Sequence, residues 1–374
     1  MSHQPHHLPP SRRKGHVRRW TALVIGGLCG ALGVLASQAA IAAPPPPPTV
    51  SVVDYDAHSS TEYAAKWSNP YGPLDGVVPQ VSSAGAVRLT DVPFQPGTDF
   101  SVFDHLKYIA ISNRSFTAPR TGSVTFSVDI AARTPGAVDG HVVHGVYGPP
   151  GSAAAGLPGT GPYSAALLEG QQAGVVLNMI DFCTGQLFDW FVSGNYAFPL
   201  VERLPTSVTG NTSNPGCPGA TEVGLDTAYT QIITNIRVAA EQTHHVAITF
   251  TRAGGQATVT YTLDGTPVAV VTDVGVPLDQ RRFVKPWTGI YPSLGPGERL
   301  ARDIGSFSIG HGLFSLLDAY PFQLGCSPVS ATPGVGECPA ETADLSVSIS
   351  PSERSFGQGA DGVFNSFTVR TLGS

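Results

Sequence analysis

The stretch Thr243–Thr272 reads THHVAITFTRAGGQATVTYTLDGTPVAVVT, and it decides the fold class. Three runs of β-branched and aromatic residues, each of strand length, are separated by Ala253-Gly254-Gly255 and by Asp264-Gly265. Gly-Gly and Asp-Gly between such runs are hairpin signals, because glycine readily adopts the positive φ that tight turns require. The stretch is therefore predicted to be a three-stranded antiparallel meander.

On both sides of this stretch, the sequence has the same pattern of short apolar runs separated by Gly, Pro, Asn and Asp. Further strands are expected at Ser123–Ile130, Val175–Phe182 and Leu187–Val192. Asp226–Glu241 has a helical alternative, but its β-branched residues favour strand. Because no period of about 20 to 50 residues repeats, propellers and solenoids are excluded, and we predict an all-β jelly-roll β-sandwich.

The composition agrees with a folded, strand-rich protein. The 374 residues include 43 Gly and 33 Pro, which disfavours long helices. Only 13% of the residues are charged and 41% are hydrophobic, so a solvated disordered chain and a coiled coil are excluded. The formal net charge of −6 and the scarcity of Lys and Arg argue against a nucleic-acid-binding surface.

The beginning of the chain has the layout of an export signal. Five basic residues and no acidic one precede an apolar stretch at residues 20–36, and Ala-Ile-Ala at 40–42 fits a small-x-small cleavage site. We predict a signal peptide at 1–42, a proline-rich spacer at 43–49 and a β-sandwich domain at 50–374. Within that domain, residues 326–374 are expected to hold a cysteine-closed loop and the closing strand.

An uncleaved membrane anchor is the alternative, which the shortness of the apolar stretch disfavours. The two arginine pairs before the apolar stretch leave the export route open. After cleavage the chain would keep 16 basic and 27 acidic residues, a formal charge of −11, which argues against phosphate backbones and anionic lipid as partners. The mature protein is expected to be secreted, extracellular and monomeric.

Four cysteines follow residue 42, and an even number in an exported chain favours disulfides over metal ligation. Three pairings are possible, of which we expect Cys183 with Cys217 and Cys326 with Cys338. The first would tie a hairpin turn to a later loop, and the second would close a loop rich in Pro and Gly. No two are spaced as C-x-x-C, so neither a zinc nor a redox site is expected.

Several phrases of the sequence resemble a family of uncharacterised secreted proteins of actinobacteria and fungi. The matching phrases are FDHLKY at 103–108, NMIDF at 178–182, FDWF at 188–191, ERLP at 202–205 and LLDA at 316–319. The ending VFNSFTV at 363–369 is similar to the last strand of concanavalin A-like jelly rolls, which pairs beside the first strand. The resemblance spans most of residues 54–325 and implies a lectin- or glucanase-type sandwich without an established activity.

Jelly rolls of this type hold sugars on the concave sheet, where carboxylates bind hydroxyls or do acid/base work. Glycosidases on this fold carry an E-x-D-x-E-like run on one strand, and this chain has none. The acid/base candidates are Asp181, which interrupts an apolar run, and Glu202, for which a surface pair with Arg203 is the alternative.

The turn after Asp181 decides whether that residue can pair with Asp189. A two-residue turn at Thr184-Gly185 would place Asp181 opposite Phe188, with the two aspartates on opposite faces of the hairpin. A three-residue loop would reverse that arrangement. The sequence therefore does not support a catalytic pair of Asp181 and Asp189.

Ligand-binding candidates come from titratable groups placed where a core needs none. His105, Asp181 and Asp318 each lie in or beside an apolar run, and we expect them to mark the functional end of the sandwich. Structural hydrogen bonding is the competing account. Trp190 and Tyr196 are candidates for a sugar-stacking subsite, although sandwiches commonly bury such rings in the core.

Two histidine pairs, His141 with His144 and His244 with His245, do not predict a catalytic metal. Residues one or three apart in a strand point to opposite faces, so neither pair can chelate one ion while the strand is regular. No G-x-S-x-G, H-E-x-x-H or phosphate-binding glycine loop is present in the sequence.

Asp54 and Asp56 lie on one face of the first expected strand and could contribute to a structural calcium site, with an exposed carboxylate pair as the alternative. No other cofactor is expected. The sequence thus predicts a secreted jelly-roll protein that binds polysaccharide or cell-wall glycan without catalysis. A polysaccharide-active glycoside hydrolase or lyase is the alternative, and the sequence does not decide whether the protein is an enzyme.

Overall fold

The computed structural model describes residues 49–69, 77–93, 106–136, 142–147, 166–169, 173–203, 229–234, 236–274, 298–299, 304–315, 347–349 and 359–373. The chain divides into two units, Met1–Pro46 and Pro47–Ser374, and all described residues belong to the second. Within these ranges a single helix, α1 (Ser60–Lys66), accompanies many strands, which confirms the all-β class. No helix there is both long and apolar enough to cross a membrane. The predicted signal peptide and nearly all of the spacer lie outside the described residues.

The first sheet contains the predicted meander. Its described strands are joined side by side in antiparallel order, and β1 pairs with β22 beside them. The order is β17 (Thr266–Val271), β16 (Gln256–Leu263), β15 (Thr243–Ala253), β7 (Gly122–Arg133), β22 (Gly359–Gly373), β4 (Val87–Pro93) and β3 (Gln80–Val81), with β1 at Thr49–Asp54. Strands β15 to β17 confirm the meander, and Asp264 and Gly265 both have positive φ in its second turn, as the sequence signal requires.

The second sheet carries the strands on either side of the candidate acids. Its path is β13 (Tyr229–Ile232), β12 (Tyr196–Arg203), β11 (Gln186–Ser193), β10 (Ala173–Asp181), β20 (Ser306–Ser315), β5 (Leu106–Ser112) and β2 (Trp67–Ser68). Beside this path, β14 (Ile236–Arg237) pairs with β12 and β6 (Phe116–Thr117) pairs with β20. Strands β13 and β14 fall inside the stretch 226–241, where the sequence favoured strand over helix.

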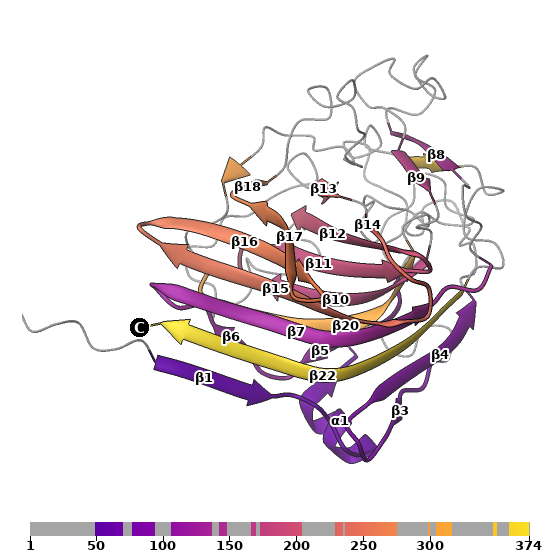
Figure 1. The fold of residues 1–374 in the computed structure, drawn as a ribbon, viewed down its shortest axis with the longest axis horizontal. Helices are drawn as coiled ribbons and strands as arrows, with labels where there is room; N and C mark the ends of the chain where they lie inside the picture. The colour runs from indigo at the N-terminus through magenta and orange to yellow at the C-terminus, as the bar shows by residue number, and fades with distance from the viewer. Residues whose placement is uncertain are drawn as a thin grey trace, which may run out of the picture. The chain divides into compact units, whose positions relative to one another are not determined.

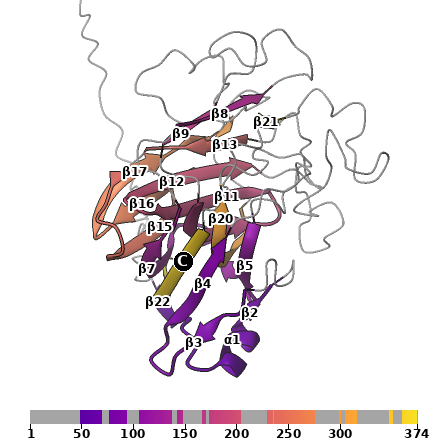
Figure 2. The ribbon, with the colours of Figure 1, turned by 90° about the vertical axis from the view of Figure 1, so that its right-hand side faces the viewer.

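Two smaller sheets complete the described strands. One joins β18 (Asp273–Val274) to β19 (Glu298–Arg299), and the other has the order β21 (Val347–Ile349), β8 (Val142–Tyr147) and β9 (Ala166–Glu169). Figure 1 shows β22 running between β7 and β4, and Figure 2 shows α1 near β2 and β3. The two large antiparallel sheets, packed face to face, form the predicted jelly-roll sandwich.

The closing strand β22 pairs with the opening strand, as expected from the sequence. Val53 lies opposite Val369 and Thr49 opposite Gly373. A bulge interrupts β22 between Asn365 and Thr368, where Ser366 has a φ of 62°. The strand therefore turns its last residues toward β1 while its first residues pair with β4.

Apolar side chains from both sheets fill the space between them. Two polar groups from opposite sheets reach across this core: Trp190 Nε1 donates to the carbonyl of Ala247 at 2.9 Å, and Tyr261 Oη donates to that of Leu200 at 2.6 Å. Both rings are fully buried and meet edge to face, with centroids 5.8 Å apart. Satisfied hydrogen bonds of this kind remove most of the cost of burying a polar atom.

A histidine is also buried in this core. His311 Nε2 lies 2.9 Å from Tyr63 Oη, which in turn lies 2.9 Å from Tyr108 Oη. The imidazole packs edge-on against Trp67 and Phe364, with centroids 4.5 and 4.8 Å away. Its Nδ1 has no hydrogen-bond partner among the described residues. Burial lowers the pKa of His311 to about 3, so the ring is neutral at pH 7.

Glycine at position 312 is required by the close approach of β20 to β5. A Cβ there would lie 2.1 Å from the backbone oxygen of Tyr108 and 2.9 Å from the Phe314 ring. We expect Gly312→Ala to lower the free energy of unfolding by about 3 kcal/mol, because the backbone must shift to relieve the clash. Denaturant titration measures this. Gly305→Ala is the control, since nothing lies within 4 Å of its added Cβ; equal losses in both variants would contradict the close-approach account.

Candidate functional site

Three polar side chains share the outer face of the second sheet, the face turned away from the first sheet. Neighbouring residues on β10, β11 and β12 alternate between the sandwich core and this face. Met179, Phe188 and Val201 point into the core. Asn178 and Asp189 therefore lie on the outer face, as does Glu202, which sits one residue beyond Val201 on β12. The outer face is itself buried, because every residue of β11 and β12 is shielded from solvent.

The register places the three groups next to one another. Asn178 lies directly opposite Asp189, and its Nδ2 donates to Asp189 Oδ1 at 2.6 Å. Asp189 is opposite Leu200 and Glu202 is opposite Leu187, so the two carboxyl-bearing residues are diagonal neighbours on adjacent strands. Diagonal positions are about 7 to 8 Å apart, within reach of long side chains.

Two oxygens of this cluster lack donors. Asn178 Oδ1 and Asp189 Oδ2 are both buried and have no hydrogen-bond partner among the residues that the structure describes. A buried acceptor without a donor costs free energy, since it has lost its water without gaining a replacement. Sites that bind or transform a ligand commonly retain such groups.

Burial and mutual repulsion set the charge of the pair. Loss of solvent raises the pKa of Asp189 well above its ordinary value, and the hydrogen bond from Asn178 partly opposes this. The pKa of Glu202 is also raised, first by burial and then by the negative charge of Asp189. Two such carboxyls cannot both ionise readily, because burial and the nearby negative charge both favour the protonated form. An acid beside a base is the arrangement that proton transfer requires.

Aromatic rings occupy the outer face further along the strands. Phe191 and Phe198 lie opposite each other and stack with centroids 5.0 Å apart and planes 15° apart. Tyr196 is at the start of β12, where Arg237 lies over its ring at 5.0 Å and donates to its hydroxyl at 3.2 Å. Because Glu202 is six residues further along an extended strand, about 20 Å away, Tyr196 does not belong to the carboxyl cluster.

Asp181 occupies a different position from the one that the sequence suggested. It lies opposite Gln186, not Phe188, because residues 182–185 form a four-residue turn. Asp181 and Asp189 still lie on opposite faces, as the two-residue turn had predicted. The Asp181 carboxylate accepts hydrogen bonds from the backbone N–H groups of Cys183 and Thr184, at 3.3 and 3.0 Å, and from the Thr184 hydroxyl at 2.6 Å. These bonds hold the turn closed.

We expect Asp181→Ala to lower the free energy of unfolding by about 2 to 3 kcal/mol, since hydrogen bonds to a charged acceptor are among the stronger ones. Thermal unfolding followed by circular dichroism measures the loss. Asp181→Asn keeps the shape and should lose less. Any glycan binding or turnover by the protein should survive in Asp181→Asn; its disappearance at near-normal stability would return Asp181 to the functional site.

Two further predictions concern described residues, namely Trp190 and the Glu202–Arg203 pair. Trp190 belongs to the inner face and packs in the core, so it does not line the outer face. Glu202 and Arg203 are only 6% and 5% exposed, so the alternative of a surface pair is wrong. His105 and Asp318 lie outside the described residues.

The cysteine prediction can be followed at one position. Cys183 is disulfide-bonded, while Cys217, Cys326 and Cys338 lie outside the described residues. Both predicted pairings therefore stay predictions.

His244 and His245, two of the four candidate metal ligands, each contact a carboxylate of the protein. His244 Nδ1 lies 2.8 Å from Asp264 Oδ2, whereas His245 Nδ1 lies 2.7 Å from Asp129 Oδ1. The adjacent histidines thus contact different carboxylates. His141 lies outside the described residues, and no group of three or more metal-ligating side chains occurs in the described ranges.

The carboxylates considered for calcium accept backbone hydrogen bonds. Asp54 Oδ1 accepts from the backbone N–H of Asp56 at 2.9 Å, and Asp56 Oδ1 accepts from that of Phe367 at 2.7 Å. The second bond ties the bulge of β22 to the end of β1. These contacts give both residues a structural role at the edge of the first sheet.

The sequence contains a signal for the Asp189–Glu202 pair that the expectations did not use. Gly194-Asn195 is a two-residue hairpin signal, and Ser193 indeed lies opposite Tyr196. Counting back from that turn puts Asp189 and Glu202 two positions apart on the same face. The turn after β11 is therefore more informative about the site than the turn after Asp181.

Comparisons with known proteins give a family but no activity. No curated protein matches the chain. Among solved structures, an endo-1,3-β-glucanase from Streptomyces sioyaensis is 11% identical, with 89% of this chain and 99% of that chain covered and a TM-score of 0.38. The lectin UEA-II complexed with galactose is 11% identical, with 87% and 99% covered and a TM-score of 0.30. The carbohydrate binding module CBM66 from Bacillus subtilis is 10% identical, with 67% and 92% covered and a TM-score of 0.25. Residues 159–373, more than half of the sequence, match a family of unknown function, DUF6081, and the chain therefore belongs to that family.

Proposed function

We propose that the protein acts on a polysaccharide at the outer face of the second sheet, with Asp189 and Glu202 as an acid/base pair. The observation that carries the proposal is the diagonal placement of two buried carboxyls, each of which has a raised pKa. Glycoside hydrolases use two carboxyl groups about 5 to 9.5 Å apart, one protonated and one charged. The diagonal relation between Asp189 and Glu202 falls in that range.

Asn178 has a supporting role in this proposal. Its amide donates to one oxygen of Asp189 and leaves the other oxygen without a donor among the described residues. A carboxyl held in this way is oriented, with its second oxygen available to a sugar hydroxyl or a water. The neutral member of the pair would donate a proton to the leaving oxygen, and the charged member would act as base or nucleophile.

Glycan binding without catalysis is the second candidate function. Asp189 is 1% exposed and Glu202 is 6% exposed, so a polysaccharide reaches them only if the outer face opens. The absence of a carboxylate triplet on one strand also favours this candidate. In that case Asn178, Asp189 and Glu202 would bind sugar hydroxyls.

A substrate panel separates the two functions. The full-length protein is incubated with β-1,3-glucan, xylan, cellulose and arabinan, and new reducing ends and binding are both measured. Hydrolysis is expected on at least one polysaccharide and should be lost in Glu202→Gln, whereas Glu241→Gln, an exposed site, should keep it. Binding without product would favour the second function. Neither binding nor product on any glycan would overturn the proposal.

We further propose that the protein is exported after cleavage behind residue 42 and is a monomer with the two predicted disulfides. The sequence pattern at 1–42 and the disulfide-bonded state of Cys183 support this. The mass of the secreted protein and a non-reducing peptide map test both statements. An uncleaved terminus, or Cys183 joined to Cys326, would contradict them.

A further inference from the structure

A pocket lies away from the carboxyl cluster, at the place where β1 begins and β22 ends. Its volume is about 820 Å³, and its lining comes from β1, β6, β15, β22, the segment before β7 and residues 304–305. None of the described lining residues belongs to β10, β11 or β12. Ligand pockets in proteins have about 300 to 1,000 Å³, so this one is large enough for a small organic molecule.

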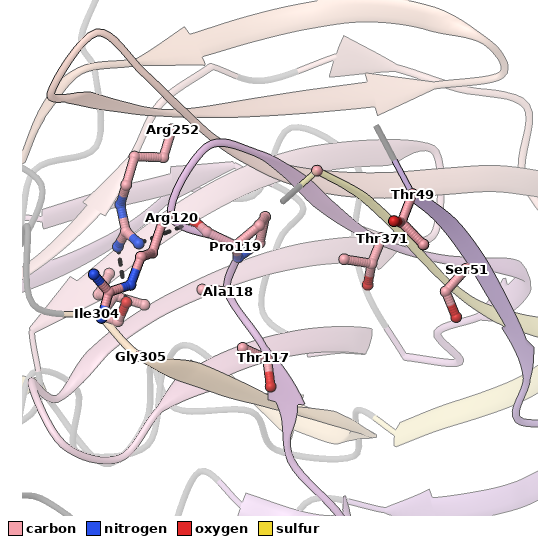
Figure 3. Close-up of a pocket in the computed structure, with 11 residues that line it drawn as sticks. Thr49, Ser51, Thr117, Ala118, Pro119, Arg120, Arg252, Ile304, Gly305 and Thr371 are labelled. Atoms are coloured by element: carbon pink, nitrogen blue, oxygen red, sulfur yellow. Dashed lines mark hydrogen bonds between the residues drawn. The ribbon is translucent and has the colours of Figure 1, made fainter. Parts of the chain in front are cut away.

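Two arginines form one wall of this pocket. The Arg252 guanidinium donates to the carbonyl of Pro119 at 3.1 Å and to that of Ile304 at 2.8 Å, and it lies over the Phe250 ring at 5.1 Å. These contacts fix its position. Figure 3 shows the guanidinium of Arg120 beside that of Arg252 at the same side of the pocket. Two like charges placed side by side favour an anion between or before them.

Among the described residues, the rest of the lining carries no negative charge to balance the arginines. No carboxylate is among the described residues that line the pocket, although the whole chain has a formal net charge of −6. Hydroxyl groups are present instead, from Thr49, Ser51, Thr117 and Thr371. Hydroxyls can both donate and accept, so they suit a ligand that carries many hydroxyls of its own.

We propose that this pocket binds an acidic saccharide, with its carboxylate held by Arg120 and its hydroxyls by the threonine and serine side chains. Arginine presents a planar fork of donors that matches a carboxylate, which a free hydroxyl does not. The volume favours a sugar over a bare inorganic anion, since a single small ion leaves most of 820 Å³ unfilled. The proposal does not depend on the carboxyl pair, because the two sites share no described residue.

Isothermal titration of the full chain with trigalacturonate tests the proposal, with neutral maltotriose and sodium sulfate as the comparison ligands. Trigalacturonate is expected to bind at least about tenfold more tightly than either, and added salt should weaken that binding. Arg120→Gln should weaken it about tenfold, the change expected when one charge-assisted hydrogen bond of about 1.4 kcal/mol is lost. Arg120 is exposed, so this variant should fold normally.

Arg370→Gln is the matched control. It removes the same charge from an exposed position on β22, next to Thr371, but its side chain points to the opposite face of the strand. This control should leave the affinity for trigalacturonate within about twofold of the starting value, since salt screens an exposed charge that lies outside the pocket. Equal weakening in both variants, equal affinity for sulfate or maltotriose, or no binding of trigalacturonate would each overturn the proposal.

Discussion

Asp189→Asn is expected to remove polysaccharide hydrolysis and to stabilise the fold at the same time. Loss of one member of an acid/base pair lowers turnover by about 10² to 10⁴-fold. The amide has no charge to bury, and it can keep the hydrogen bond from Asn178, which is 2.6 Å from Asp189 in the structure. We therefore expect the free energy of unfolding to rise by about 1 to 3 kcal/mol at pH 7.5, as functional residues often cost stability.

The gain should depend on pH in a definite direction. Burial raises the pKa of Asp189 in the folded state, whereas the unfolded chain releases this proton above about pH 4. Between these two pKa values the folded state binds more protons than the unfolded state. The contribution of Asp189 to the free energy of unfolding is therefore fully present at low pH and is lost as pH rises through the folded-state pKa. Asp189→Asn should consequently gain less at pH 4.5 than at pH 7.5.

Urea titrations at the two pH values, together with the hydrolysis assay, measure both effects. Asp129→Asn is the control, because that carboxylate contacts His245 at 2.7 Å on a partly exposed strand position and should bring no gain. A variant that loses activity and stability together would indicate a structural role for Asp189. An equal gain at both pH values would contradict the buried-charge account.

His311→Leu is expected to make the protein more resistant to acid. The pKa of this histidine is lowered to about 3 in the folded state, while the unfolded chain takes up the proton below about pH 6.5. The neutral ring therefore contributes fully to the free energy of unfolding above about pH 6.5, and this contribution is lost as the pH falls toward about 3. The loss reaches about 3 kcal/mol at pH 4 and about 4 kcal/mol at pH 3, because each pH unit between the two pKa values contributes about 1.4 kcal/mol.

Leucine has a volume close to that of histidine and cannot be protonated, and Tyr63 Oη keeps its 2.9 Å contact with Tyr108 Oη. The variant should be slightly less stable than the original chain at pH 7 and more stable at pH 4. Urea titrations across about pH 3.5 to 7.5 check this, with His245→Leu as a control that leaves the acid loss in place. The same slope in both variants would contradict the role of His311.

The buried carboxyls and His311 affect the free energy of unfolding in opposite directions between about pH 4 and 6.5. Falling pH stabilises the folded state through Asp189 and Glu202 and destabilises it through His311. The free energy of unfolding of the unsubstituted protein should thus vary less with pH than that of either variant. Combining Asp189→Asn with His311→Leu should give additive changes, since the two residues lie on opposite faces of the second sheet.

Local turn chemistry explains which elements of the fold the sequence predicts well. Asp264-Gly265 and Gly254-Gly255 each specify a tight hairpin, and β15 to β17 form as expected. The four-residue turn after Asp181 was less predictable, because Thr184 donates to the Asp181 carboxylate and closes the turn two residues earlier in register. Register set by a side-chain hydrogen bond is harder to derive than register set by glycine.

The candidate site shows the same limit. The sequence singled out Asp181 as the acid inside an apolar run, but its carboxylate accepts three local hydrogen bonds. Asp189 is equally buried, has an oxygen without a donor among the described residues, and was not singled out as a site residue. Both β11 and β12 are buried on both faces, so hydrophobic alternation does not separate core from site. The pairing with Glu202 follows only after the Gly194-Asn195 turn fixes the register.

The position of β22 has a consequence for the order of folding. This strand follows all the others in the described chain, yet it lies between β7 and β4 and also pairs with β1. The meander β15 to β17 can form as soon as it is synthesised, since its contacts are local, whereas the middle of the first sheet waits for the last strand. Contacts between residues so distant in sequence make folding slow. During that interval the edges of β7 and β4 that β22 later covers are open to other chains, and such unpaired edges are sites of aggregation.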